Sequence, residues 1–72
     1  MKLNYYADTD SLYIDFSTTE SVDSVEISSG VVVDYDASGN VTGIDIDHAS
    51  ELLDLNELVT SHLPVKKQAI SA

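Results

Sequence analysis

The chain has 72 residues, and its 13 acidic residues against three lysines and no arginine give a formal net charge of −10. A chain of this length forms one domain with one small core, and a hydrophobic content of 43% indicates a globular rather than a disordered protein. The absence of cysteine excludes a disulfide scaffold, a zinc finger and a thiol nucleophile.

A β-hairpin is predicted within residues 2–16, with its turn at residues 7–10. The second half of this segment alternates apolar and polar residues, which is typical of a strand with one buried face. We therefore expect Tyr13 and Asp15 to lie on the face of the sheet that points away from the core. A short strand is expected at residues 25–27.

A second β-hairpin is predicted from residues 31–36 and 41–47. The short polar loop between them contains Gly39, which can supply the positive φ that a tight turn needs. Pairing Asp36 with Val41 would place the alternate apolar residues of both strands on one face. The opposite face would then carry Val32, Asp34, Asp36, Val41, Gly43 and Asp45.

An amphipathic helix is predicted in the C-terminal third of the chain. Asp54 and Glu57 have the spacing of a capping box. One stripe at helical spacing is formed by Leu55, Leu58, Val59 and His62. Pro64 is expected to end this helix, because proline disfavours helical geometry in the residue before it.

These elements predict an α+β fold, a small antiparallel sheet of two β-hairpins packed against one C-terminal helix. We expect a single domain over residues 1–64 and a mobile C-terminal tail over residues 65–72. The predicted core consists of Leu3, Leu12, Ile14, Phe16, Val31, Val33, Ile44, Ile46, Leu55, Leu58 and Val59.

A single helix covers only one face of such a sheet, so the other face is left as a mixed apolar and acidic surface. We predict that this surface binds a protein partner, because interface centres commonly combine an aromatic anchor with charges at the rim. The predicted partner-binding residues are Tyr13, Asp15, Val32, Asp34, Asp36, Val41 and Asp45.

The distribution of charge restricts the kind of partner. Lys2, Lys66 and Lys67 are the only lysines, and all three lie near the ends of the chain. An acidic surface repels phosphate, so we expect a basic protein as partner and no direct binding of nucleic acid or membrane. There are two alternatives to a basic partner. The uncovered face could form a homodimer, or the acidic residues could serve only to keep the protein soluble.

No apolar run approaches the ~20 residues that a membrane span requires. Asn4, Asp8 and Asp10 interrupt the apolar segment that a signal peptide would need at this end of the chain. We therefore expect a cytoplasmic protein.

Residues 34–45 have the spacing of a calcium-binding loop, with oxygen ligands at several of its positions and Gly39 at its turn. Such a loop surrounds its ion between two helices, whereas both flanks here are predicted as strands. Its last position is also Asp45 rather than the longer glutamate. We favour a hairpin turn with acidic flanks, and we predict no metal and no other cofactor.

Asp47, His48 and Ser50 supply the residue types of a hydrolytic triad, but residues so close in sequence do not easily converge on one point. We expect Ser50 to cap a short helical turn instead. Asp8 and Asp10 are interpreted as turn residues, because a chain of this size has little material for a glycosidase cleft. No catalytic residue and no enzyme activity are predicted.

The chain contains two stretches that together form a recognisable pattern. The first is YYADTDSLYI at residues 5–14, and the second is GNVTGIDI from Gly39, followed shortly by Ala49-Ser50. They resemble the Y-D-x-x-x-D-x-L-Y-I and G-x-x-x-G-I-E-I-L-x-A-S segments of DUF2283, a family of small prokaryotic proteins of unknown function. The resemblance covers about residues 3–58, most of the chain.

Three positions depart from this family pattern, which usually has aspartate, glutamate and an apolar residue where this chain has Tyr6, Asp45 and Asp47. The resemblance implies no established activity. Because some members are encoded beside small toxin-like proteins, it implies the role of a neutralising partner.

The sequence thus predicts a non-catalytic acidic binding protein, a neutralising (antitoxin-like) partner of a basic protein. A nucleic-acid-mimicking inhibitor of a nucleic-acid-binding protein is one alternative. An uncharacterised soluble domain that only homodimerises and a calcium-dependent module are the others.

Overall fold

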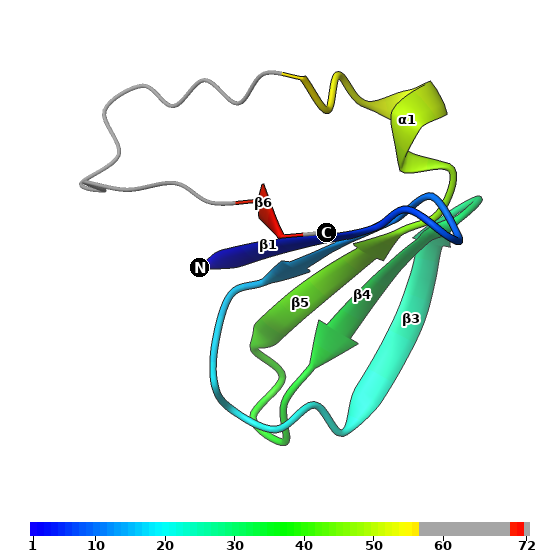
Figure 1. The fold of residues 1–72 in the computed structure, drawn as a ribbon. Coiled ribbons are helices and arrows are strands. Elements are labelled where there is room, and N and C mark those ends of the chain that lie inside the picture. Colours follow the sequence, from blue (N-terminus) through cyan, green and yellow to red (C-terminus); the bar gives the residue numbers. More distant parts are fainter. Residues whose placement is uncertain (57–69, 72) are drawn as a thin grey trace.

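A computed structural model describes residues 1–56 and 70–71, which form a twisted sheet and one short helix (Figure 1). The described elements are β1 (Lys2–Tyr6), β2 (Ser11–Asp15), β3 (Asp23–Ser28), β4 (Val31–Tyr35), β5 (Val41–Ile46), α1 (Ala49–Leu52) and β6 (Ile70–Ser71). The strand order is β3-β4-β5-β2-β1-β6, and all neighbours are antiparallel except β6, which runs parallel to β1.

Both predicted hairpins are confirmed, and each turn has a local cause. In the β1–β2 turn Asp10 has a φ of 52°, a left-handed conformation that aspartate tolerates better than most residues. In the β4–β5 turn Gly39 has a φ of 84°. There Asp36 Oδ1 accepts the backbone N–H groups of Ser38 and Asn40, each at 2.9 Å, and this closes the loop.

The predicted pairing of β4 with β5 is confirmed from Val31 to Asp34 but is wrong at its end. Asp34 pairs with Gly43, yet the next residue, Tyr35, pairs with Val41. Thr42 is therefore the extra residue of a β-bulge, which shifts the strand by one position. The predicted pairing of Asp36 with Val41 does not form.

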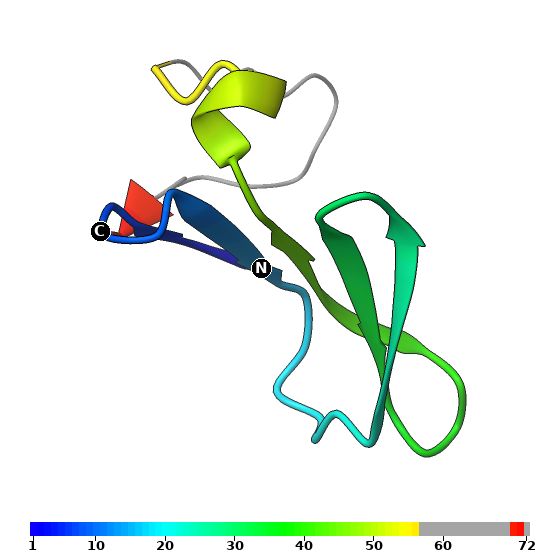
Figure 2. The same ribbon diagram turned by 90° about the vertical axis from the view of Figure 1, so that its right-hand side faces the viewer.

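The core lies on the face of the sheet that α1 covers, and Figure 2 shows α1 above the end where β5 finishes. Leu3, Leu12 and Ala49 form a buried cluster, with Ala49 fully buried. Tyr5, Ile14, Ile46 and Leu55 pack against this cluster. The prediction of Phe16 as a core residue is wrong, because it follows the far end of β2, beyond the reach of α1, and is 41% exposed.

The α+β prediction is only partly confirmed, because the described residues are mainly β-sheet and contain one four-residue helix. Of the predicted capping box and helix, only Asp54–Asn56 is described, where Asp54 Oδ1 accepts the N–H of Asn56 at 3.0 Å. Glu57 through Pro64, including the predicted core residues Leu58 and Val59, lies outside the described residues.

The predicted tail at residues 65–72 is described only at Ile70–Ser71, which forms β6. Neither α1 nor any other described segment is a helix long and apolar enough to cross a membrane.

Helix α1 is held by Asp10 of the β1–β2 turn rather than by Ser50 as predicted. The Asp10 carboxylate accepts the hydroxyl of Ser50 at 2.7 Å, the N–H of Ser50 at 3.1 Å and the hydroxyl of Tyr5 at 2.7 Å. Its backbone carbonyl accepts the N–H of Ala49 at 2.9 Å. One residue thus satisfies the first N–H groups of α1, which a helix cannot satisfy by itself. We call this set of bonds the Asp10 clamp.

The Asp10 clamp makes stability depend on pH. The hydrogen bond from Ser50, then that from Tyr5, holds the pKa of Asp10 below its ordinary value of 3.8. Because folding favours the ionised carboxylate, its contribution is present above the unfolded-state pKa and is lost as pH falls through the lower folded-state pKa.

We therefore expect the substitution Asp10→Asn to lower the melting temperature at pH 7. Asparagine tolerates the same left-handed turn conformation, so the loss reports the carboxylate. The difference from the wild type should shrink as pH falls below 3.8. Asp8→Asn, at an exposed position of the same turn, is the control and should change stability much less. Equal losses in both variants, measured by thermal unfolding, would contradict the clamp.

Candidate functional site

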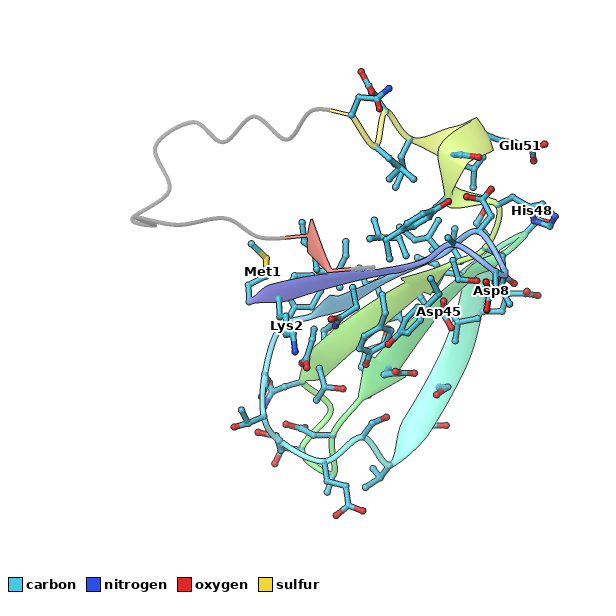
Figure 3. The ribbon with its side chains drawn as sticks, viewed as in Figure 1. Met1, Lys2, Asp8, Asp45, His48 and Glu51 are labelled. Atoms are coloured by element: carbon cyan, nitrogen blue, oxygen red, sulfur yellow. The ribbon has the colours of Figure 1, made fainter. Side chains whose placement is uncertain are left out.

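The face of the sheet away from α1 brings together five of the seven predicted site residues. Strand register places Tyr13 beside Asp45, Asp45 beside Val32, and Asp34 and Asp15 on either side of Gly43. Figure 3 shows Asp45 and Lys2 on this side of the sheet. We call this surface the acidic face, defined by Tyr13, Asp15, Val32, Asp34, Gly43 and Asp45.

Tyr13 lies along the sheet above Gly43 instead of projecting into solvent. A Cβ atom added to Gly43 would collide with the hydroxyl and Cζ of Tyr13, and would lie 3.0 Å from the carbonyl oxygen of Ile14. The glycine therefore provides the space that the ring occupies, a common role of glycine within a strand. This contact was not predicted, although a lone glycine in a strand is a sequence signal for close approach.

Asp34 connects three strands of the acidic face. Its Oδ2 accepts the hydroxyl of Tyr13 from β2 at 2.9 Å, and its Oδ1 accepts the hydroxyl of Ser24 from β3 at 2.6 Å. The burial of the phenol, followed by its hydrogen bond to Asp34, raises the pKa of Tyr13 to about 12. Tyr13 therefore remains a neutral donor at physiological pH, with its ring fixed across β5.

The carboxylates of the acidic face lie close enough to affect one another. Partial loss of hydration, followed by repulsion from Asp47 and Asp34, raises the pKa of Asp45. Lys2, on the strand next to Asp15, is the only lysine or arginine within residues 1–56 and 70–71. In the described part of the chain, the negative charge of this face is therefore largely unneutralised.

Two predicted site residues do not belong to this face. Asp36 lies in the β4–β5 loop, where its carboxylate closes the turn. Val41 pairs with Tyr35 because of the bulge at Thr42, and paired residues of neighbouring strands share a face. The bulge thus moves Val41 to the side of Tyr35, opposite to Asp45.

The segment 34–45 forms the predicted hairpin, and its acidic side chains are distributed between the turn and the acidic face. Asp34 and Asp45 lie on the acidic face, whereas one carboxylate oxygen of Asp36 is used by the turn. Within residues 1–56 and 70–71, no three histidine, cysteine, aspartate or glutamate side chains are grouped so as to hold a metal ion.

The three residues considered as a hydrolytic triad, Asp47, His48 and Ser50, lie within the described part of the chain and do not form hydrogen bonds with one another. The hydroxyl of Ser50 donates to Asp10, and Asp47 accepts the hydroxyl of Ser11 at 3.2 Å. His48 is exposed, with a φ of 53° at the N-cap of α1. The structure does not align the hydroxyl of Ser50 with His48.

Within residues 1–56 and 70–71, fold and site define a small sheet protein in which α1 covers one end of one face and the other face is acidic. The chain belongs to the family described as "Protein of unknown function (DUF2283)", whose model matches residues 2–50. The matched residues include the whole acidic face and the Asp10 clamp, and the resemblance predicted from the sequence is confirmed. No curated protein and no solved structure shows a significant match to this chain.

The contact of Tyr13 with Gly43 can be tested by a double-mutant cycle. Gly43→Ala should cost about 1–3 kcal/mol of stability, because its methyl group displaces the ring of Tyr13. In a Tyr13→Ala background the cost should be clearly smaller. Gly39→Ala is the matched control, since its strain comes from a φ of 84° and has no relation to Tyr13. Urea denaturation measures all four combinations, and an equal cost of Gly43→Ala in both backgrounds would contradict the contact.

The raised pKa of Asp45 predicts the opposite pH dependence to that of Asp10. The folded state binds the proton of Asp45 more tightly than the unfolded state, so stability falls as pH rises above the ordinary value of 3.8. Asp45→Asn should therefore raise the melting temperature at pH 7 by a few degrees and have little effect below that value. Added salt should reduce the gain by screening Asp47 and Asp34. A gain that is independent of both pH and salt would exclude crowding of these charges as its cause.

Proposed function

We propose that this protein is a non-catalytic binding protein whose acidic face binds a basic protein, as a neutralising, antitoxin-like partner does. The observation that carries this proposal is the arrangement around Tyr13. Asp34, Asp45 and Asp15 lie around an aromatic ring that is already fixed by a hydrogen bond. An ordered, acidic and open surface of this kind is suited to a cationic partner.

The carboxylates provide both attraction and recognition. A surface of one charge accelerates the encounter with a partner of the opposite charge, and this effect weakens with salt. Asp34 already accepts two hydrogen bonds, but a carboxylate has about four acceptor positions, so it can still receive an arginine or lysine. Tyr13 supplies a rigid ring against which a guanidinium group can stack.

The titration of Asp45 should make the affinity for a basic partner depend on pH. Its pKa is raised in the free protein, and a cation placed beside it would lower that pKa. Binding of a basic partner should therefore become stronger as pH rises through this range, because the cation relieves the repulsion that Asp45 experiences from Asp34 and Asp47.

The test begins with co-purification of the full chain from its native host, followed by kinetic measurements with the recovered partner. Asp15→Asn combined with Asp45→Asn should slow association about tenfold at low salt, with a smaller effect at high salt. The control combines Asp8→Asn with Asp54→Asn, two exposed positions outside the acidic face, and has the same net charge.

An effect of equal size in the control would mean that net charge alone drives binding and that the acidic face is not the site. A recovered partner that is itself acidic would contradict the proposal. Displacement of the protein by DNA would favour the nucleic-acid-mimicking inhibitor. A change from dimer to monomer in Tyr13→Ala, without change in partner affinity, would assign the face to self-assembly.

A further inference from the structure

Strand β3 is an open edge of the sheet. It is the first strand in the order β3-β4-β5-β2-β1-β6, and no strand among the described residues pairs with its outer side (Figure 1). All of its residues, Asp23–Ser28, are exposed. It also contains no proline and no lysine, two residue types that commonly prevent an edge strand from pairing with another chain.

The hydrogen bonds of the neighbouring strands show which backbone groups of β3 point away from β4. Asp47, just after β5, donates its N–H to the carbonyl of Gly30 at 2.8 Å, so the backbone groups of Gly30 point toward β5. Along β4, the backbone groups of successive residues then point alternately toward β3 and toward β5. Through the register of β4 with β3, this alternation leaves the backbone groups of Ser24 and Glu26 directed outward. Consistently, the N–H of Ser24 donates to the adjacent side chain of Asp23 at 2.9 Å.

The side chains of β3 define the sequence that could pair with it. Val25 is 45% exposed and pairs with Val33 on the core side of the sheet. Ser24 and Glu26 lie on the other side, where Ser24 reaches Asp34 of the acidic face. A strand added at this edge would therefore place alternate residues beside Val25 and beside Glu26. The first set should be apolar and the second basic.

A hollow lies at the end of β3, between the β3–β4 turn and α1. It is lined by three acidic residues, Glu26, Asp47 and Glu51, together with His48 and Leu52. Figure 3 shows His48 and Glu51 at this end of the molecule. A strand that follows the β3 edge reaches this hollow, where a lysine or arginine side chain would lie among acidic residues.

We propose that an extended segment of a basic protein, with apolar residues alternating with lysine or arginine, adds to the sheet as a strand beside β3. This inference rests on the proposed function and gives its binding mode. The register shift between Glu26 and Ser28 limits regular pairing to Asp23–Glu26. A second copy of this chain is disfavoured as the occupant because each copy carries a net charge of −10.

The experiment uses the full chain and a synthetic peptide of about eight residues that alternates lysine and valine, long enough to span β3. Amide hydrogen exchange, followed residue by residue by NMR, reports pairing at the edge. Saturating peptide should slow the exchange of Ser24 and Glu26 by about tenfold or more. A peptide that alternates glutamate and valine should have no such effect.

Ser24→Pro with Ser24→Ala forms a matched pair of variants. Both remove the hydroxyl group that bonds Asp34, but only proline removes the outward N–H, a change that edge strands tolerate. Ser24→Pro should weaken binding of the lysine–valine peptide about tenfold relative to Ser24→Ala. If Ser24→Pro does not fold, the exchange measurement on the wild-type chain still decides.

The outcomes separate this inference from the proposed function. Peptide binding that perturbs Tyr13 and Asp45 but leaves Ser24 and Glu26 unprotected would overturn the edge mode and leave the acidic face as the site. No binding of the lysine–valine peptide at low salt would count against both. Equal binding of the glutamate–valine peptide, or protection of Ser24 that rises with protein concentration alone, would overturn the basic segment as occupant.

Discussion

The Asp10 clamp is the interaction on which the arrangement of the sheet and helix depends. Asp10 adopts a left-handed turn conformation, and its carboxylate and carbonyl bind the first residues of a helix that begins 39 positions later, at Ala49. Ala49 is thereby fully buried in the cluster with Leu3 and Leu12. Because α1 is so short, it covers only one end of one face. No described element covers the opposite face, where the carboxylates of β2, β4 and β5 lie.

The acidic face combines order with electrostatic strain. Because Gly43 has no side chain, the ring of Tyr13 can lie across β5, and a hydrogen bond to Asp34 on β4 fixes this ring. At the same time Asp45 is pushed toward its protonated form by loss of hydration and by Asp47. This combination of order and unfavourable charge is the reason why we propose the acidic face as a binding site, where a cationic partner would relieve the repulsion. The β3 edge, which no described strand covers, lies next to this surface, and our proposal is that one basic segment contacts both.

The fold explains why the two stretches of the DUF2283 pattern occur together. The two stretches of the family pattern meet in space, because Asp10 of the first accepts hydrogen bonds from Ala49 and Ser50 of the second, and also from Tyr5 of its own stretch. These residues build the clamp. Asp47, which stands where the family pattern has an apolar residue, is exposed at the end of β5 and accepts a hydrogen bond from Ser11, so it does not disturb the core.

The sequence by itself determined the two hairpins, the buried face of their strands and the acidic character of the face away from α1. These features follow from two-residue alternation and turn chemistry, both of which are local. Tertiary structure alone decided four other features. The bulge at Thr42 moved Val41 to the opposite face, the short helix left Phe16 exposed, Tyr13 packed over Gly43, and Asp10 capped α1. Each depends on how strands twist and pair, and contacts between residues distant in sequence leave no periodic signal along the chain.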